Sequence, residues 1–362
     1  MLYWLLVPLR SDFFLFNVFR YITVRTAAAG ITALVLSFLL GPRLIRLLAK
    51  RQIGQEIRAD GPKAHYAKKG TPSMGGLLVI LCTLVPTLLW GNLSNIYVWV
   101  AVLSMVLFGL VGLIDDILKV RRKQSLGLRP GQKMIMQVVL AAVVGLIFIW
   151  MSSRGQFSLY LSFPFFKQWV PYLGWLYLPW IMFILVGSSN AVNLADGLDG
   201  LAIGLTLISV AALTALTYIA GHALWSQYLS IARVPQAAEL TVFVGAFAGS
   251  SLGFLWLNCH PAQIFMGDVG ALSIGATMAV ITLLIKQEFL LFTLAGVFIL
   301  EAISVLLQVS YFKLSKGKRI FKMAPLHHHF ELSGWPEERV VIRFWILGII
   351  FALFSLSTLK LR

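Results

Sequence analysis

The chain has 362 residues, of which 59% are hydrophobic and only 12% are charged, and its formal net charge is +16. This composition excludes an ordinary soluble domain and is typical of an integral membrane protein. The excess Lys and Arg residues lie in short runs between apolar stretches, a pattern typical of loops at a membrane surface and not of a nucleic-acid groove. The two cysteines, Cys82 and Cys259, give neither a disulfide framework nor metal-ligand spacing.

Apolar runs of roughly 17 to 22 residues, long enough to cross the hydrocarbon core of a bilayer as helices, recur ten times along the chain. No polar stretch between them is long enough to form a separate soluble domain. We therefore predict an all-α integral membrane protein that forms one domain over residues 1–362. Its predicted transmembrane helices cover residues 22–42, 73–91, 96–115, 134–152, 171–188, 200–220, 239–257, 269–286, 289–310 and 341–359.

The Lys and Arg residues predict which ends of these helices face the cytoplasm. The loops after the first, third and ninth predicted helices carry eight, six and seven of the 30 basic residues, whereas the opposite side carries nine over six segments. By the positive-inside rule, those three loops are cytoplasmic and both termini face outward. The loops 188–200 and 257–269 then also face the cytoplasm, although neither contains Lys or Arg.

Two adjacent carboxylates, Asp115 and Asp116, close the third apolar run and are followed at once by basic residues. A carboxylate at the edge of a membrane is costly and indicates a functional site. Two neighbouring carboxylates repel each other unless a cation neutralises them, and Mg²⁺ is a suitable cation because it binds carboxylates and leaves room for phosphate oxygens. The alternative is that the pair only caps the helix and meets the basic run in solvent.

The predicted topology favours the functional interpretation of this pair. Asp196, Asp199 and Asp268 lie in the two cytoplasmic loops that lack basic residues, so five of the seven aspartates are expected at one membrane surface. A shared site for a cation and a phosphate would explain why these acidic residues gather there.

The loop from Ser188 to Gly200 is rich in small amide and carboxylate side chains. Its Asn190, Asn193 and Asp196 are spaced by three, so one helical turn would place all three on one face. Its glycines allow a tight turn whose N–H groups could hold a nucleotide or phosphate at the start of the next helix. Ordinary turn and cap chemistry explains about two such residues, but not the whole group.

The loop 258–270 reads NCHPAQIFMGDVG and again ends one apolar run and opens the next with an aspartate. Asp268 is either a ligand or a simple N-cap. Phe265 could stack on a base or could anchor the loop at the membrane interface.

Two further segments carry candidate phosphate-binding groups. Residues 68–76 begin with Lys68 and Lys69 and continue as a glycine-rich turn. The backbone N–H groups of such a turn could contact phosphate. His327, His328 and His329 are consecutive and do not share a helix face, so they are not a ready transition-metal site. Beside a phosphate they could donate hydrogen bonds or charge. The basic run before them could hold lipid head groups or could simply set the topology.

Together these segments resemble the polyprenyl-phosphate N-acetylhexosamine-1-phosphate transferase superfamily, and within it the phospho-MurNAc-pentapeptide transferases. The resemblance covers nearly the whole chain, and the run of three histidines separates this family from its GlcNAc-1-phosphate relatives. The segments that carry it are KKGTPSMGG at 68–76, GLIDD at 112–116, GSSNAVNLADGLDGLA at 187–202, NCHPAQIFMGDVG at 258–270 and APLHHHFELSGWPE at 324–337.

The resemblance implies transfer of phospho-MurNAc-pentapeptide from UDP-MurNAc-pentapeptide to undecaprenyl phosphate, which gives lipid I and UMP during peptidoglycan synthesis. It also implies ten transmembrane helices, periplasmic termini, a cytoplasmic active site in a bacterial inner membrane, a Mg²⁺ requirement and a homodimer. Two alternatives are a sister transferase that uses UDP-GlcNAc and a non-enzymatic lipid transporter. A transporter would place its ionisable residues near the middle of the membrane. In this sequence the ionisable residues are expected at one membrane surface, and Glu301 is the main exception.

The resemblance also implies roles for single residues. Asp268 would bind Mg²⁺ directly, with Asp115 and Asp116 close by, and Lys133 would pair with phosphate. Asp115 would act as a base toward the lipid phosphate or would only orient the metal and substrate. A phosphate monoester is already largely ionised at pH 7, because its second pKa is about 6, so a strong base is not needed.

The remaining implied roles concern substrate binding. The nucleotide site would be lined by Asn190, Asn193, Asp196 and Asp199. Asn258 and Phe265 would lie near the uracil, and Lys68 near phosphate. The three histidines would lie near the sugar-phosphate, with His327 as a catalytic residue.

Overall fold

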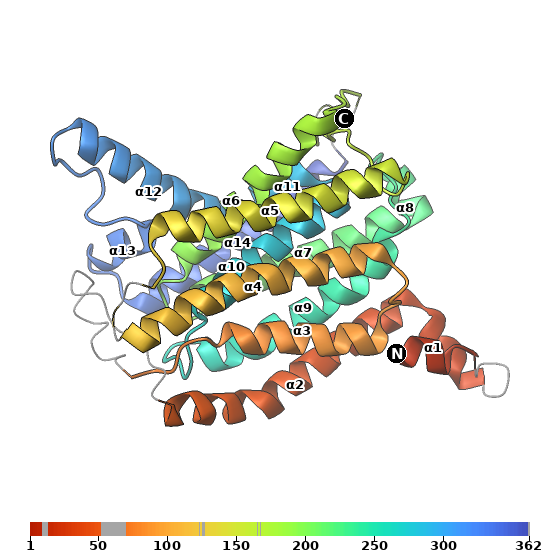
Figure 1. The fold of residues 1–362 in the computed structure, drawn as a ribbon, viewed down its shortest axis with the longest axis horizontal. Helices are drawn as coiled ribbons and strands as arrows, with labels where there is room; N and C mark the ends of the chain where they lie inside the picture. Colours follow the sequence, from red (N-terminus) through yellow and green to blue (C-terminus); the bar gives the residue numbers. More distant parts are fainter. Residues whose placement is uncertain are drawn as a thin grey trace.

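The structure is a computed structural model that describes residues 1–8, 14–51, 70–122, 124, 127–164, 166 and 168–360. Long helices run side by side and form a bundle (Figure 1). They are α2 (Ile22–Lys50), α3 (Gly76–Trp90), α4 (Ile96–Arg122), α5 (Pro130–Ser153), α6 (Tyr177–Ala195), α7 (Leu201–Gly221), α9 (Ala237–Asn258), α10 (Gly267–Leu284), α12 (Gly296–Leu314) and α14 (Glu337–Thr358). Short helices connect them: α1 (Leu2–Leu6), η2 (Phe14–Arg20), η4 (Gly174–Leu176), α8 (Ala223–Tyr228), α11 (Glu288–Leu294) and α13 (Leu326–Glu331).

The prediction of a multi-pass, all-helical membrane protein is confirmed. In the described part of the chain, nine helices are long and apolar enough to cross a membrane. The second predicted span differs: α3 is apolar but has 15 residues. At about 1.5 Å per residue, α3 is shorter than the roughly 30 Å hydrocarbon core. The prediction of ten full-length spans was therefore wrong at this helix.

The ninth predicted span, 289–310, is not one helix. α11 ends at Leu294, and α12 begins at Gly296. Gly296 packs closely on α14, where an added Cβ would lie 2.8 Å from the ring of Phe351. The chain changes direction at this glycine, and α12 then extends away from the rest of the bundle (Figure 1). Hydropathy alone does not detect the break, because apolar residues fill both helices.

The centre of the bundle is α10, whose residues from Val269 to Leu284 are all buried. It packs against α3, α4 and α6, among others. Small residues permit this packing: an added Cβ at Gly270 would lie 2.8 Å from the backbone of Gly76 in α3, and one at Gly275 would lie 2.4 Å from the Ser188 carbonyl in α6. Gly270 therefore holds the first turn of α10 against α3, and Gly275 holds the helix against α6 further along.

Three glycines spaced by four, Gly245, Gly249 and Gly253, form a stripe on α9 that faces α2. An added Cβ at Gly249 would lie 2.1 Å from the carbonyl oxygen of Gly30, and one at Gly253 would lie 2.4 Å from Cβ of Ser37. Backbones that approach so closely gain dispersion contacts, which in a bilayer replace the missing hydrophobic driving force between helices. The stripe therefore fixes the distance between α2 and α9.

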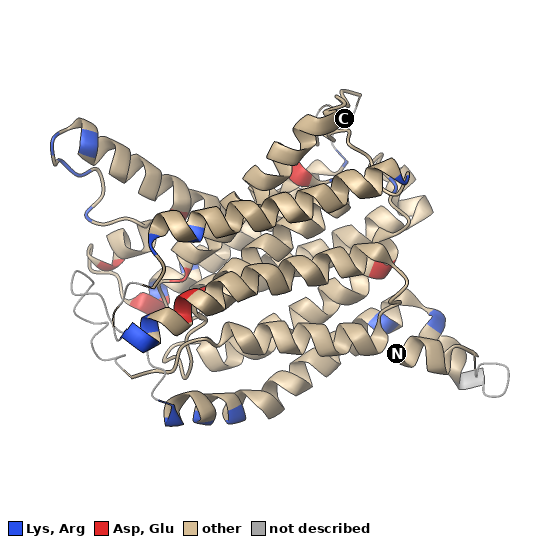
Figure 2. Cartoon of the chain, in the orientation of Figure 1, with Lys and Arg blue, Asp and Glu red and all other residues tan. Residues whose placement is uncertain are grey.

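The charged residues gather mainly at the ends of the bundle, and both signs meet at the end where α2 and α4 finish (Figure 2). The ends of α2, α4 and α12, which lead into the three basic loops, lie on this side of the bundle (Figure 1). The prediction that these loops share one end is therefore consistent with the arrangement of the helices.

We expect Gly249→Ala to destabilise the protein by about 1–3 kcal/mol, because the added methyl group overlaps the backbone of Gly30 and forces α2 away from α9. The measurement is thermal unfolding of the purified protein in detergent. Gly187→Ala in α6 is the matched control, because an added Cβ there meets nothing within 4 Å. Equal melting temperatures for the two variants would contradict a stabilising role for the stripe.

Candidate active site

Asp115 and Asp116 lie within α4, and both are almost fully buried, with 2% and 4% of their surface exposed. Asp115 Oδ1 accepts a hydrogen bond from the backbone N–H of Leu128 (2.7 Å), in the segment after α4. Asp116 Oδ2 accepts one from the backbone N–H of Val269 (3.1 Å), in the first turn of α10. The pair is therefore not a solvent-exposed helix cap, since it joins α4 to two other segments.

Asp268 lies in the first turn of α10, next to this pair. Two glycines make the approach possible. An added Cβ at Gly112 would lie 2.2 Å from the carbonyl oxygen of Asp268, so α4 and α10 touch through their backbones. Gly267 has a φ of +71°, which other residues rarely adopt, and an added Cβ there would lie 2.6 Å from Asp116 Oδ2.

Two lysine amines neutralise most of the charge of the three aspartates. Lys119 Nζ lies 2.7 Å from Asp115 Oδ2, 3.3 Å from Asp116 Oδ1 and 2.7 Å from Asp268 Oδ2. Lys133 Nζ, from the first turn of α5, lies 2.7 Å from Asp268 Oδ2 and 3.9 Å from Asp115 Oδ2. Lys133 was predicted to pair with phosphate, whereas Lys119 was not predicted to belong to the site. Lys119 follows Asp115 by four residues and Asp116 by three, so on a helix it is placed to contact both.

The three aspartates fit a divalent cation. One carboxylate oxygen from each of Asp115, Asp116 and Asp268 lies within 4.8 Å of the others. Mg²⁺ prefers oxygen ligands, commonly takes one or two protein carboxylates, and fills its other positions with water and substrate phosphate oxygens. Lys119 contacts one oxygen of each of these three carboxylates, and its side chain is 30% exposed. Its amine therefore has room to turn toward solvent when a cation binds.

Asn193, near the end of α6, completes this group of side chains. In the orientation of its amide that satisfies both partners, its nitrogen donates to Asp268 Oδ1 (2.8 Å) and its oxygen accepts from Lys133 Nζ (3.2 Å). Asn190, one turn earlier, instead donates to the side-chain oxygen of Gln137 (2.7 Å) and to the Val186 carbonyl (2.8 Å). Asn190 therefore connects α6 to α5, and Asn193 alone of the two touches the aspartates.

Asp196 is the C-cap residue of α6. Burial, together with repulsion from Asp268, Asp116 and Asp199, raises the pKa of its carboxyl to about 8. Asp196 is therefore close enough to the aspartates of α4 and α10 to sense their charge.

Asp199 belongs to a different group of side chains. Its Oδ2 lies 3.1 Å from His260 Nδ1 and accepts a hydrogen bond from the Ala262 backbone (3.1 Å). Its own N–H donates to Glu337 Oε1 (2.8 Å), at the start of α14, and Glu338 Oε1 lies 3.2 Å from His260 Nε2. Asp199 thus fastens the loop after α6 to the loop after α9 and to the start of α14.

Asn258 is buried and serves the backbone. Its side-chain oxygen accepts from the Gly200 N–H (3.1 Å), and its amide donates to the Ile264 carbonyl (2.8 Å), so it joins the loops 196–200 and 259–266. Both polar ends of its side chain are therefore used within the fold, and its expected place near the uracil stays a prediction. Phe265 is partly exposed, and its backbone pairs with Pro72 and Gly75.

The three histidines have three different surroundings. His327 is fully buried, and its Nδ1 lies 3.3 Å from Glu301 Oε1. His328 Nδ1 lies 2.8 Å from Glu331 Oε2. His329 Nδ1 accepts a hydrogen bond from the Lys322 backbone (3.1 Å). Each imidazole therefore has its own polar neighbour, while the rings of His327 and His328 lie 4.2 Å apart. Their expected place near the sugar-phosphate stays a prediction.

The sequence of the chain is similar to those of several bacterial proteins. Residues 98–286 match the profile of glycosyl transferase family 4. The chain is 50% identical to the phospho-N-acetylmuramoyl-pentapeptide-transferase of Koribacter versatilis, 51% identical to that of Thermodesulfovibrio yellowstonii and 51% identical to that of Citrifermentans bemidjiense. Each alignment covers the full length of both chains. The chain belongs to this family. It is therefore a transferase and a multi-pass membrane protein of the phospho-N-acetylmuramoyl-pentapeptide-transferase family.

Several charged residues of the site region were not predicted from the sequence. Lys119 lies in a basic run that topology alone explains, and Glu301 was an exception to the surface pattern. His260 and Glu337 lie within motifs that carry the resemblance but were given no role, and Glu338 directly follows the second of these motifs. Lys68, predicted to bind phosphate, lies outside the described residues.

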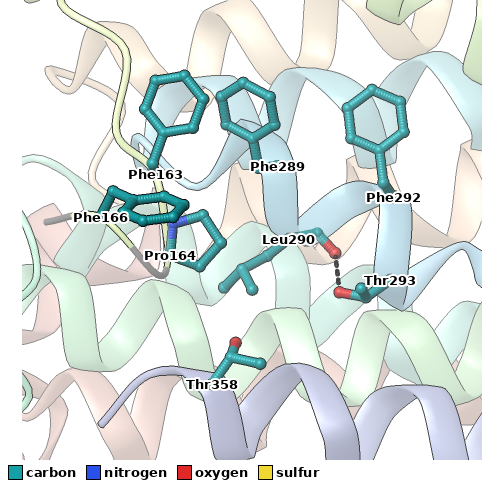
Figure 3. A pocket seen from close by; sticks show the side chains of 8 residues that line it. All are labelled: Phe163, Pro164, Phe166, Phe289, Leu290, Phe292, Thr293 and Thr358. Carbon is teal, nitrogen blue, oxygen red and sulfur yellow. Dashed lines mark hydrogen bonds between the residues drawn. The ribbon is translucent and has the colours of Figure 1, made fainter. Parts of the chain in front are cut away.

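An apolar cavity of about 240 Å³ lies far from the aspartates, at the opposite end of α10 (Figure 3). It is lined by Phe163, Pro164, Phe166, Phe289, Leu290, Phe292, Thr293 and Thr358. The 18 residues of α10 separate its first turn from this region by roughly 27 Å. The lining carries no titratable side chain, so the cavity is no competitor for the site of phosphate chemistry.

The raised pKa of Asp196 predicts a pH-dependent stability. An unfolded aspartate has a pKa of about 3.9, so between pH 4 and pH 8 the folded state holds a proton that the unfolded state lacks. Stability is then lost as the pH rises through this window. Asp196→Asn is uncharged throughout, so its unfolding free energy relative to the wild type should increase by about 1 kcal/mol per pH unit between pH 5 and 7.

The measurement is thermal unfolding of both proteins in detergent across this pH range, with a chelator present so that divalent cations do not add charge. A difference in melting temperature that does not change with pH would show that Asp196 is ionised in the folded protein.

Proposed function

We propose that this chain transfers phospho-MurNAc-pentapeptide from UDP-MurNAc-pentapeptide to undecaprenyl phosphate, releasing UMP and forming lipid I. The observation that supports this most strongly is the group of Asp115, Asp116 and Asp268 with Lys119 and Lys133 at one end of a membrane helix bundle. The names of the full-length relatives favour this reaction over transfer from UDP-GlcNAc and over lipid transport without chemistry.

The reaction brings two anionic phosphates together, so the site must reduce their repulsion. Asp268 is the proposed main ligand of Mg²⁺, with Asp115 and Asp116 as further ligands. Bound there, Mg²⁺ supplies positive charge to the phosphate oxygens and to the leaving UMP. Lys119 and Lys133 supply further positive charge, and Asn193 holds the Asp268 carboxylate in a fixed orientation.

The geometry favours an orienting role for Asp115 over the role of general base. Its Oδ1 accepts the Leu128 N–H, and its Oδ2 lies 2.7 Å from Lys119 Nζ. Both oxygens are therefore engaged, and the attacking lipid phosphate is already largely ionised at pH 7. Asp115 then serves by holding Lys119 and the metal where the two phosphates meet.

The nucleotide is proposed to lie over the loops after α6 and α9, which Asn258 joins. In the first loop, Asp196 is near enough to Asp116 and Asp268 for their charges to raise its pKa. In the second loop, Phe265 is exposed enough to stack on uracil. Asp199, Asn190 and Asn258 act there by holding the loops in place. The lipid substrate approaches from the bilayer between helices.

The positive-inside rule places this end of the bundle at the cytoplasmic face of a bacterial inner membrane, with both termini in the periplasm. UDP-linked sugars are made in the cytoplasm, so this orientation gives the site access to its soluble substrate. The resemblance to the family further supports a homodimer.

Asp268→Asn should reduce UMP release from UDP-MurNAc-pentapeptide by more than tenfold, about 1.4 kcal/mol of barrier, because the amide keeps the shape but loses the charge that binds the cation. The assay varies Mg²⁺ in the presence of undecaprenyl phosphate, and UDP-GlcNAc replaces the natural sugar nucleotide in a parallel reaction.

Glu338→Gln is the control, since it removes a 54%-exposed carboxylate from the same end of the molecule. A folded Asp268→Asn protein with more than a tenth of wild-type activity would reduce Asp268 to a helix cap. Equal turnover of UDP-GlcNAc would instead favour the sister transferase.

The orientation is tested with single cysteines at Ser333 and Ser153, both exposed and at opposite ends of the bundle, in a protein without Cys82 and Cys259. In bacteria with a permeabilised outer membrane, an impermeant thiol reagent should label position 153 at once. Position 333 should react only after the inner membrane is opened. Labelling of position 333 from outside would place the aspartates in the periplasm and exclude a cytoplasmic sugar nucleotide as substrate.

A further inference from the structure

A carboxylate lies in the apolar helix α12, where no part of the proposed chemistry uses it. Glu301 is fully buried. Its Oε1 accepts a hydrogen bond from the backbone N–H of His327 (3.2 Å) and lies 3.3 Å from Nδ1 of the same residue. A buried carboxylate is costly in a membrane protein unless it is paired, and such residues commonly serve the function. Its pairing with His327 identifies the imidazole as the group that Glu301 serves.

The opposite edge of the imidazole faces the loop after α6. An added Cβ at Gly197 would lie 2.3 Å from His327 Nε2, so the ring occupies the space that a side chain at this position would need. Gly197 directly follows Asp196, which the proposed function places at the nucleotide. Among the described residues, neither ring nitrogen of His327 has a hydrogen-bond partner, although both are buried: Nδ1 lies beside the Glu301 carboxylate, and Nε2 faces Gly197. A buried polar atom left without a partner calls for a functional explanation.

We propose that Glu301 is a positioning residue that holds His327 with Nδ1 toward α12 and Nε2 toward the turn of Asp196 and Gly197. A carboxylate beside one imidazole nitrogen favours the proton on that nitrogen and leaves the other to act. Nε2 is then available to an oxygen of the sugar-phosphate once the turn moves to admit it. This inference rests on the proposed transfer reaction and on the role near the sugar-phosphate that the family resemblance implies for His327.

Another side chain of α12, Gln308, holds the segment between α12 and α13 without contacting His327. Gln308 Oε1 accepts the backbone N–H groups of Ile320 (3.1 Å) and Phe321 (3.0 Å), and its Nε2 donates to the Phe321 carbonyl (3.2 Å). Gln308 lies about two turns beyond Glu301. A purely mechanical link between α12 and α13 would therefore make the two residues equivalent, whereas positioning of the imidazole is specific to Glu301.

The experiment is a double-mutant cycle on the full-length protein in detergent with Mg²⁺. We expect Glu301→Gln to lower kcat for UMP release at least tenfold, with a KM for the UDP-linked sugar changed less than threefold and a melting temperature near that of the wild type. In the His327→Asn background, Glu301→Gln should have no further effect, because the group through which it acts is gone. Gln308→Ala should reduce activity by the same factor in both backgrounds.

Multiplicative losses for Glu301→Gln and His327→Asn would overturn the inference and make Glu301 a structural residue. If His327→Asn keeps wild-type activity, neither His327 nor Glu301 takes part in the mechanism, and the inference is overturned. The proposed reaction is tested separately, by UMP release from the wild-type protein. If Glu301→Gln does not fold, Glu301→Asp replaces it, since it keeps the charge but withdraws the carboxylate from the ring. Its loss of kcat should likewise vanish in the His327→Asn background.

Discussion

The structure depends on the close approach of α4 and α10 at Gly112. That contact places Asp268 beside Asp115 and Asp116, three carboxylates that would drive the helices apart if nothing neutralised them. Lys119 comes from α4 itself, and Lys133 from the start of α5. Helix packing and charge balance are therefore linked here. The backbone contact at Gly112 brings the three carboxylates together, and the two lysines offset the repulsion that results.

The surroundings of the aspartates divide the polar residues into two kinds. Lys119, Lys133 and Asn193 touch the carboxylates and can take part in the chemistry. Asn190, Asn258 and Asp199 hold loops and helices to one another. Such a division explains how a site built from the ends of several helices keeps its geometry, since each loop that carries a reactive side chain is also tied to a neighbouring element.

Much of this arrangement could be predicted from the sequence, because long apolar runs and the acidic residues at their ends are local signals. Asp115, Asp116 and Asp268 were predicted for that reason, Lys133 was added by the family resemblance, and the structure brings all four together. Lys119 was missed because it lies in a basic run that topology alone explains. The partnership of Glu301 with His327 and the break before Gly296 depend on contacts between distant helices, which no local pattern records.

The complete burial of α10 has a consequence for how this protein can change over time. Sixteen consecutive residues of that helix, Val269 to Leu284, face other helices and none faces lipid. Because the helix is close-packed along its length, we expect substitutions there to disturb its neighbours and, through them, the first turn that carries Asp268. Helices such as α12 and α14 expose many apolar side chains, where we expect exchange of one aliphatic residue for another to cost little. Sequence change should therefore be tolerated more readily in the outer helices than in the central one.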